Sequence, residues 1–223
     1  MSDAFELIRS RRRTIALIVE TDGRLVVRAP MRAPAKFIRE FVESKAAWIR
    51  RKQAEMRSAR LPDRRYTDGE HFFYLGKSYT LTLVGPQRPA LQLDSGFRLA
   101  RAAQSRARAA FVRWYKGRAE SEITSRVRQY AEKYGFRYER VRITSAHARW
   151  GSCSSKGTLS FTYRLVMAPP AVIDYVVVHE LVHLQVKNHS RAFWSRVGDL
   201  MPDYKVRVAW LRKNGRLLTL ETG

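Results

Sequence analysis

Apolar and polar residues alternate along the first part of the chain, a pattern that predicts β-strands. Residues 14–29 alternate on both sides of Asp22-Gly23, a dipeptide typical of tight hairpin turns. From Pro34 to Arg60 the apolar residues recur instead with the helical period. Residues 71–84 and 90–100 again have the composition of strands. The first hundred residues therefore predict a small β-rich part crossed by one helix.

The second half of the chain alternates between helical and strand-like patterns. A helical period from Ser105 to Tyr134 stops at Gly135, a residue type that commonly ends helices. Residues 140–167 are strand-like on both sides of a turn at 154–157, which predicts a hairpin or a short meander. After a double proline, the apolar residues return to the helical period. The triple valine at 176–178 would also suit a strand, but the spacing favours a helix.

We therefore expect an α+β fold in two parts. Residues 1–100 would form an N-terminal β-rich subdomain with one helix, and residues 101–223 a domain with a short sheet and a histidine-bearing helix. An apolar content of 45% is sufficient for a core. No apolar run reaches the roughly 18 residues of a membrane span, so we expect a soluble, cytoplasmic protein that does not contact membranes. The single cysteine excludes an internal disulfide and a multi-cysteine zinc site.

The chain has a formal charge of +23, mostly from arginine. Such a charge attracts polyanions, and the planar guanidinium group suits phosphate, so DNA or nucleotides are expected partners. The basic residues cluster at 9–13, 50–51, 64–65 and 101–118. In the last cluster aromatic residues alternate with arginines and could stack on bases. The alternative is an amphipathic helix whose aromatics face the core and whose arginines face water.

Three of the five histidines and one glutamate lie within residues 179–189. On a helix, His179 and His183 would share one face about 6 Å apart, so both imidazoles could bind one ion. Glu180 would project about 100° away from His179. A carboxylate beside a metal can take a proton from a water that the metal activates. This spacing is the H-E-x-x-H arrangement of zinc hydrolases.

A catalytic zinc site needs a third protein ligand, and His189 is the candidate. On a continuous helix His189 would lie about 15 Å along the axis from His179. The helix must therefore end first. Asn188 can adopt the left-handed conformation that closes helices, and Ser190 can cap a following helix, which predicts a break at 187–190. The alternatives are histidines without a metal, or a metal with a structural role.

These residues, with the flanking segments RWGSCSSKG, RLVMAPP, NHSRAFW and LMPDY, resemble the YgjP-like family of zinc metallopeptidases, which is related to the SprT-like and other zincin proteins. The resemblance covers most of the chain, including its opening RSRRRTIALIV. It implies a zincin-like catalytic domain in which His179, His183 and His189 bind Zn2+ and Glu180 is the general base. The metzincin pattern has glycine where this chain has Val186, so the chain should turn later.

The strand before the histidine helix lines the substrate cleft in zincins. The resemblance therefore places Arg149, Trp150, Gly151 and Ser152 along a substrate groove. The alternative is that Trp150 belongs to the core and that Gly151 forms a bulge. The oxyanion that develops during hydrolysis also needs a hydrogen-bond donor. The candidates by residue type and neighbourhood are Tyr204, Arg149, His147 and Arg164.

Three further residues have alternative roles. Cys153 could be a fourth ligand or an inhibitory switch, but a small buried thiol is the more common case. Met201 could form a methionine turn like that of metzincins, or simply pack in the core. Asp174 or another carboxylate could orient a ligand histidine.

The function expected from this pattern is a zinc metallopeptidase acting on peptide or protein substrates. Resemblance to SprT-like proteins suggests that the basic surfaces recruit proteins bound to nucleic acid. A first alternative is a metal-dependent phosphohydrolase of nucleotides or nucleic acid, although no glycine-rich phosphate loop is present. A second is a nucleic-acid-binding module with a structural metal.

Overall fold

The computed structural model describes residues 5–20, 23–58 and 64–220 of the chain. The described residues form two compact units, one ending at Arg64 and the other spanning Arg65–Leu220. Each unit has its own apolar core. The division comes earlier than the boundary at 100/101 that the sequence pattern predicts, and the packing of the second unit explains why.

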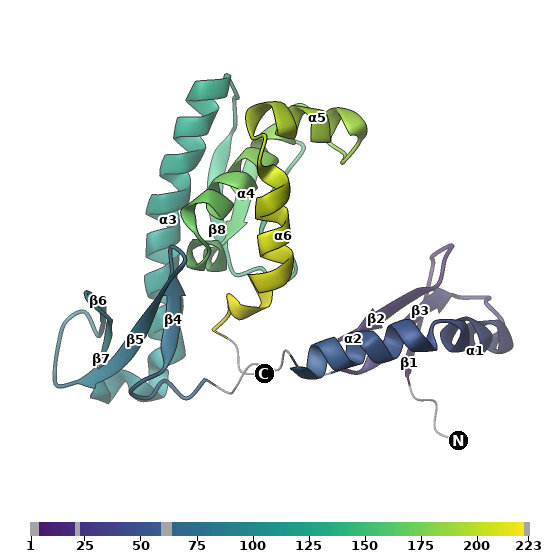
Figure 1. Ribbon diagram of the computed structural model, residues 1–223, viewed down its shortest axis with the longest axis horizontal. Coiled ribbons are helices and arrows are strands. Elements are labelled where there is room, and N and C mark those ends of the chain that lie inside the picture. The colour runs from purple at the N-terminus through teal and green to yellow at the C-terminus, as the bar shows by residue number, and fades with distance from the viewer. Residues whose placement is uncertain (1–4, 21–22, 59–63, 221–223) are drawn as a thin grey trace. The chain divides into compact units, whose positions relative to one another are not determined.

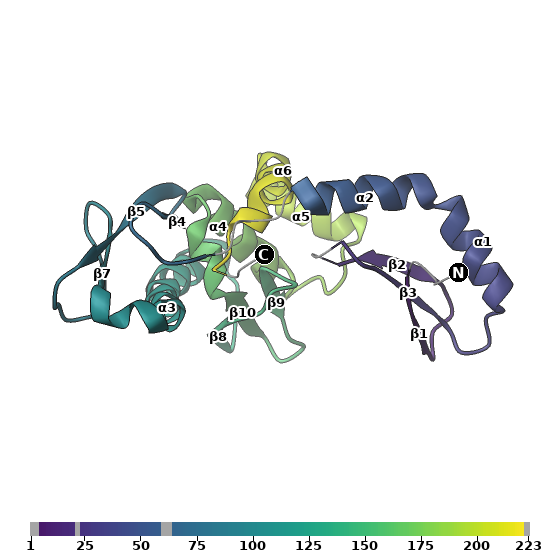
Figure 2. The same ribbon diagram turned by 90° about the horizontal axis from the view of Figure 1, so that it is seen from below.

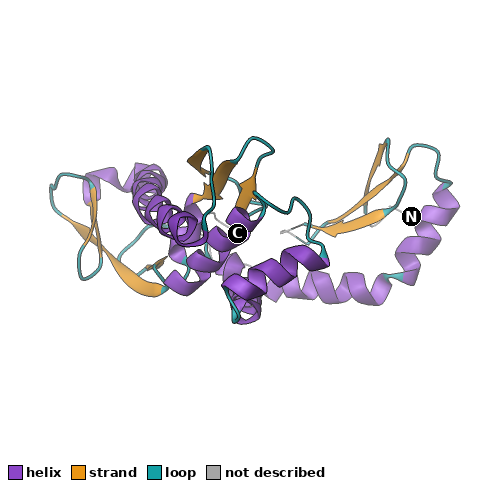
Figure 3. Ribbon diagram, turned by 90° about the horizontal axis from the view of Figure 1, so that it is seen from above, coloured by secondary structure: helices purple, strands orange, loops and turns teal. Residues whose placement is uncertain are grey.

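The first unit is a three-stranded sheet with two helices on one side (Figure 3). The predicted hairpin is present, because β2 and β3 pair antiparallel, although the turn residue Asp22 lies outside the described residues. An additional strand, β1, pairs parallel with β3. The elements are β1 (Glu6–Ser10), β2 (Ala16–Val19), β3 (Leu25–Pro30), α1 (Ala35–Ser44) and α2 (Ala46–Ser58).

The prediction of a single helix in this unit is wrong. The structure contains two helices, which meet at Lys45. The backbone of Lys45 leaves the helical conformation, with φ −105° and ψ 8°. Ile38 on α1 and Ile49 on α2 are both buried in the core that includes Val27. The change of direction at Lys45 therefore lets both helices bury an isoleucine in one small core.

The second unit begins with a four-stranded sheet in the order β4-β5-β7-β6. Each of the two predicted strand segments forms a hairpin. The phenyl ring of Phe72 in this sheet stacks on that of Phe111 in α3 (Ala107–Tyr134) at 4.2 Å between centroids. This shared core joins the sheet to the second unit, which explains the earlier boundary. The strands are β4 (His71–Tyr74), β5 (Lys77–Val84), β6 (Leu91–Leu93) and β7 (Phe97–Ala100).

A short 3-10 helix at Arg101–Arg106 leads into α3 (Ala107–Tyr134), which stops at Gly135 as predicted. Gly135 has a left-handed conformation, with φ 71°. The buried positions of α3 recur every four residues and form one stripe along the helix, as in an amphipathic helix. Phe111 and Tyr115 are fully buried, so they are not available to stack on bases. The amphipathic alternative therefore describes this segment, and the arginines remain on its exposed faces.

The remaining elements surround the histidine helix, α4 (Pro170–Val182). Strands β9 and β10 form the predicted hairpin, and β8 pairs parallel with β10, so β9 is at an edge of this sheet. Figure 1 shows α4 between α3 and α6, and Figure 2 shows the three strands together on one side of α4. Helix α6 was not predicted. The elements are β8 (Arg140–Thr144), β9 (Gly151–Cys153), β10 (Thr158–Thr162), a 3-10 helix (Tyr163–Met167), α4 (Pro170–Val182), α5 (Arg191–Leu200), α6 (Tyr204–Asn214) and a 3-10 turn (Gly215–Leu217).

Close contacts at its N-terminal end fix the position of α4. The turn between β4 and β5 donates a backbone hydrogen bond from Leu75 to the Val166 carbonyl. The adjacent Gly76 has φ +78°, and a Cβ there would lie 2.9 Å from the Pro169 Cα. Only glycine therefore allows this turn to pack against the start of α4. None of the helices described is long and apolar enough to cross a membrane.

Candidate metal centre

Three imidazoles converge at the C-terminal end of α4. His179 is in the last turn of the helix, His183 caps it, and His189 comes from the loop that follows. The Nε2 atom of His189 lies 3.1 Å from that of His179 and 3.2 Å from that of His183. Nitrogen atoms that bind one tetrahedral zinc ion at about 2.0–2.1 Å are separated by roughly 3.3 Å. The spacing of the three nitrogens therefore fits one zinc ion.

The helix ends earlier than predicted, and the loop that follows it returns His189 to the other two histidines. Helix α4 ends at Val182, and a turn covers residues 183–185. The prediction of a left-handed conformation at Asn188 is wrong. Among the described residues other than glycine, only Tyr66 and Leu75 have positive φ. Asn188 instead accepts a hydrogen bond from the backbone of Ser190 through its Oδ1 atom. Ser190 precedes α5 in an extended conformation, without the predicted side-chain cap.

Hydrogen bonds at Nδ1, the ring nitrogen that does not face the cluster, orient His179 and His183. The Nδ1 atom of His183 is 3.0 Å from the Val186 carbonyl, which can only accept, so Nδ1 is protonated and Nε2 has a free lone pair. The Nδ1 atom of His179 is 3.2 Å from the Tyr175 hydroxyl. Tyr175 was not among the predicted site residues, yet it lies four positions before His179 and hence on the same helix face.

Aromatic side chains of α5 form one wall of the histidine cluster. The buried ring of Phe193 lies 4.5 Å from the ring of His183 and 4.8 Å from that of His189. Burial, aided by the two neighbouring histidines, lowers the pKa of His179 to about 3. Burial also lowers the pKa of His183. Neutral imidazole is the form that binds metals, so this environment favours ligation.

Glu180 is buried beside the cluster, with 5% of its surface exposed. Burial raises the pKa of its carboxyl group to about 8, while the positive charge of Arg149 acts in the opposite direction. Among the described residues, Glu180 Oε2 has no hydrogen-bond partner. A Cβ at Gly151 would lie only 2.5 Å from Glu180 Oε1. The backbone of β9 therefore packs directly on this carboxyl group, and only glycine leaves it enough space.

The predicted groove residues divide between the two faces of β9. Gly151 pairs with Phe161, whose side chain is in the core, and so faces α4. Ser152 pairs with Ser160 on the opposite face. The pairing is regular, so Gly151 does not form the bulge considered above. A cavity of about 230 Å³ is lined by Thr144, Ala146, Arg149, Trp150, Gly151, Ser152, Ser160 and Thr162.

The oxyanion candidates occupy different environments. Tyr204, at the start of α6, stacks on Trp194 at 5.5 Å, and the Trp194 ring in turn lies 5.7 Å from that of His189. Arg164 is buried, donates to the carbonyl of His147 at 2.6 Å, and lies 5.2 Å from the centre of the Trp150 ring. Arg164 thus holds the loop before β9, whereas Tyr204 packs on Trp194, whose ring neighbours the histidine cluster.

The other candidates belong to the surrounding structure. Among the described residues, the group that could bind a metal contains the three histidines and not Cys153. Burial raises the pKa of the Cys153 thiol. Met201 is buried in the core. Asp174 pairs with Arg126 at 3.2 Å, and the hydrogen bond to His179 comes from the adjacent Tyr175 instead.

The match to a known protein family agrees with this arrangement. The sequence matches the YgjP-like metallopeptidase domain family over residues 13–214. Among solved structures, the chain is similar to the crystal structure of the metallopeptidase zymogen of Pyrococcus abyssi abylysin. That similarity has 21% sequence identity and a TM-score of 0.38, and it covers 44% of this chain and 98% of the other. No curated protein matched the sequence.

Proposed function

The chain belongs to the YgjP-like metallopeptidase family, and we propose that it is a zinc-dependent peptidase with Glu180 as its general base. The observation that supports this most strongly is the convergence of three Nε2 atoms beside a buried carboxyl group. A structural site would need no carboxylate next to the ligands. Catalysis needs one, because a base must accept the proton of the attacking water.

The residues present fit zinc. Three imidazole nitrogens are a common ligand set for catalytic zinc, and the exposed His189 leaves the cluster open on one side. A bound zinc ion would supply Lewis-acid polarisation of the scissile carbonyl and of the attacking water. His179, His183 and His189 would hold the ion, with the hydrogen bonds to Tyr175 and Val186 fixing the first two rings.

In this proposal, Glu180 moves the proton. Its carboxylate takes a proton from the attacking water and later gives it to the leaving amine. A base must be ionised to accept a proton, but burial favours the neutral carboxylic acid. Positive charge nearby restores the carboxylate, and Arg149 already acts in this direction. Arg149 would thus help to keep the base ionised in addition to contacting substrate.

The edge strand β9 and Tyr204 would position the substrate. One edge of β9 pairs with β10, and no described strand pairs with the other edge. An extended peptide can add to such an edge through backbone hydrogen bonds. We place the peptide along Trp150, Gly151 and Ser152, with its scissile carbonyl near Glu180. The Tyr204 hydroxyl, whose ring stacks on Trp194, would donate to the developing oxyanion.

Contact with nucleic acid is a second part of the proposal. The segment 101–118 includes six exposed cations, and no acidic residue occurs between Asp94 and Glu120. Its aromatic residues are largely buried, so the expected contact is with phosphates and not with bases. Such a surface would bring the peptidase to proteins bound on DNA. The cations are Arg101, Arg106, Arg108, Arg113, Lys116 and Arg118.

Mass spectrometry can test the chemistry directly. Zinc-loaded protein is incubated with an unfolded basic protein, with and without DNA, in the presence of mixed nucleoside triphosphates. We expect peptide products that are absent with Glu180→Gln, and more product when DNA is present. Release of phosphate with intact peptides would refute the peptidase and favour a phosphohydrolase. Equal products with and without DNA would refute the nucleic-acid part alone.

A further inference from the structure

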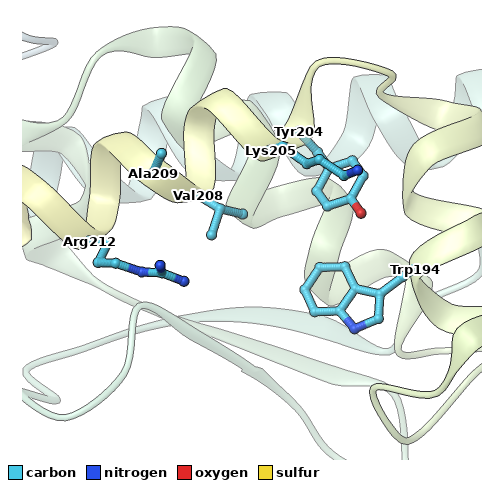
Figure 4. A pocket seen from close by; sticks show the side chains of 6 residues that line it. All are labelled: Trp194, Tyr204, Lys205, Val208, Ala209 and Arg212. Carbon is cyan, nitrogen blue, oxygen red and sulfur yellow. The ribbon is translucent and has the colours of Figure 1, made fainter.

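A second cavity lies between α5 and α6, next to the histidine cluster. Its volume is about 390 Å³. Figure 4 shows the two aromatic rings at one end of the cavity and the guanidinium group of Arg212 toward the other. The lining residues are Trp194, Tyr204, Lys205, Val208, Ala209 and Arg212.

The aromatic end of this cavity is also a wall of the metal centre. The indole of Trp194 lies 5.7 Å from the His189 ring and 5.9 Å from the His179 ring. The phenol of Tyr204 stacks on the same indole at 18° between the ring planes. A peptide with its scissile bond at the histidines would therefore place a neighbouring side chain in or at this cavity.

The other wall of the cavity combines apolar residues with two cations. Tyr204, Val208 and Arg212 are spaced four apart on α6 and so form one row along the helix, with Lys205 and Ala209 in the adjacent row. No acidic residue lines the cavity. Within the described part of the chain, neither cation forms an ion pair. The cavity thus offers an apolar surface between positive charges that have no acidic partner.

We infer that this cavity binds an acidic side chain of the peptide substrate, preferably glutamate. The methylene groups of a glutamate would contact Val208 and the indole of Trp194, while its carboxylate would accept hydrogen bonds from Arg212 or Lys205. A lysine or arginine at this position of the peptide would meet like charge. The inference rests on the proposed peptidase function for the placement of the peptide, but the charge preference of the cavity can be measured separately.

Cleavage specificity provides the first test. Peptides capped at both termini are used, so that no terminal carboxylate can occupy the cavity, and the zinc-loaded protein is profiled on a mixed library. At one fixed position beside the cleaved bond we expect glutamate to be favoured over lysine about tenfold or more. Arg212→Glu should reverse this preference. Lys213→Glu makes the same charge change on the same helix outside the lining, and should leave the preference unchanged.

A binding measurement separates this inference from the peptidase function. Zinc-loaded Glu180→Gln protein is titrated calorimetrically with capped alanine-based peptides rich in glutamate, glutamine or lysine. Tightest binding of the glutamate peptide, weakened by Arg212→Glu and not by Lys213→Glu, supports the cavity even if the wild type cleaves nothing. Cleavage without any acidic preference, or equal effects of the two charge reversals, would overturn the inference and leave the peptidase function intact.

Discussion

Replacing Gly151 by alanine tests whether the position of the Glu180 carboxyl group determines activity. The added Cβ would lie 2.5 Å from Oε1, 2.6 Å from Cγ and 2.8 Å from Cδ of Glu180. Ordinary contact begins at 3.4 Å, so the carboxyl group must move by about 0.9 Å. Gly151 does not have positive φ, so alanine adds no backbone strain. The flexible glutamate side chain should therefore move, while the strand stays in place.

The expected loss of activity is large and the loss of stability moderate. Misplacing a catalytic group by about 1 Å costs on the order of 100-fold in rate. Overpacking typically costs about 1–3 kcal/mol of stability. We expect Gly151→Ala to bind zinc normally, as measured by chelator competition, and to cleave a peptide substrate about 100-fold more slowly. Gly117→Ala is the matched control, since its Cβ would contact nothing within 4 Å. Wild-type activity of Gly151→Ala would refute this reasoning.

Three further changes test other parts of the structure. Tyr175→Phe removes the hydroxyl group that orients His179, and zinc affinity should fall about tenfold in a chelator competition; unchanged affinity would contradict that role. Metal-free protein should lose stability as the pH rises from about 6.5 to about 8, because folded Glu180 retains its proton when the unfolded chain has lost it. Below about pH 6.5 the lowered pKa of His179 acts in the opposite direction. Thermal unfolding at about pH 6.5 and about pH 9 should show this loss, and Glu180→Gln should remove it. Gly76→Ala should destabilise the fold by about 1–3 kcal/mol in urea, because its Cβ would strike Pro169; an unchanged midpoint would show that this contact is not tight.

Much of the site could be predicted from the sequence, because its geometry is local. Two histidines four residues apart on a helix share a face whatever surrounds the helix. The need for His189 to return also followed from the rise of a helix alone. The way in which the chain returns could not be predicted. The hydrogen bond of His183 to the Val186 carbonyl and the packing of Phe193 depend on where the chain goes after Val182.

The parts that were missed depend on contacts between distant segments. The glycine at 151 was expected in a substrate groove, but its contact with Glu180 requires β9 to lie against α4. The sheet at residues 71–100 belongs with α3 because Phe72 packs on Phe111, and apolar periodicity does not reveal pairing partners. Helix α6 has charged residues on several sides and no strong apolar face, so periodicity gave no indication of it.

The most direct test of the central claim compares bound zinc with peptide cleavage in the wild type and in Glu180→Gln. Zinc content is measured by elemental analysis after dialysis, and cleavage of an unfolded polypeptide is measured on the same samples. The proposed function predicts one zinc per chain in both proteins and cleavage only in the wild type. Cleavage by zinc-loaded Glu180→Gln at the wild-type rate would contradict a general base at Glu180, and no zinc in either protein would contradict the metal centre itself.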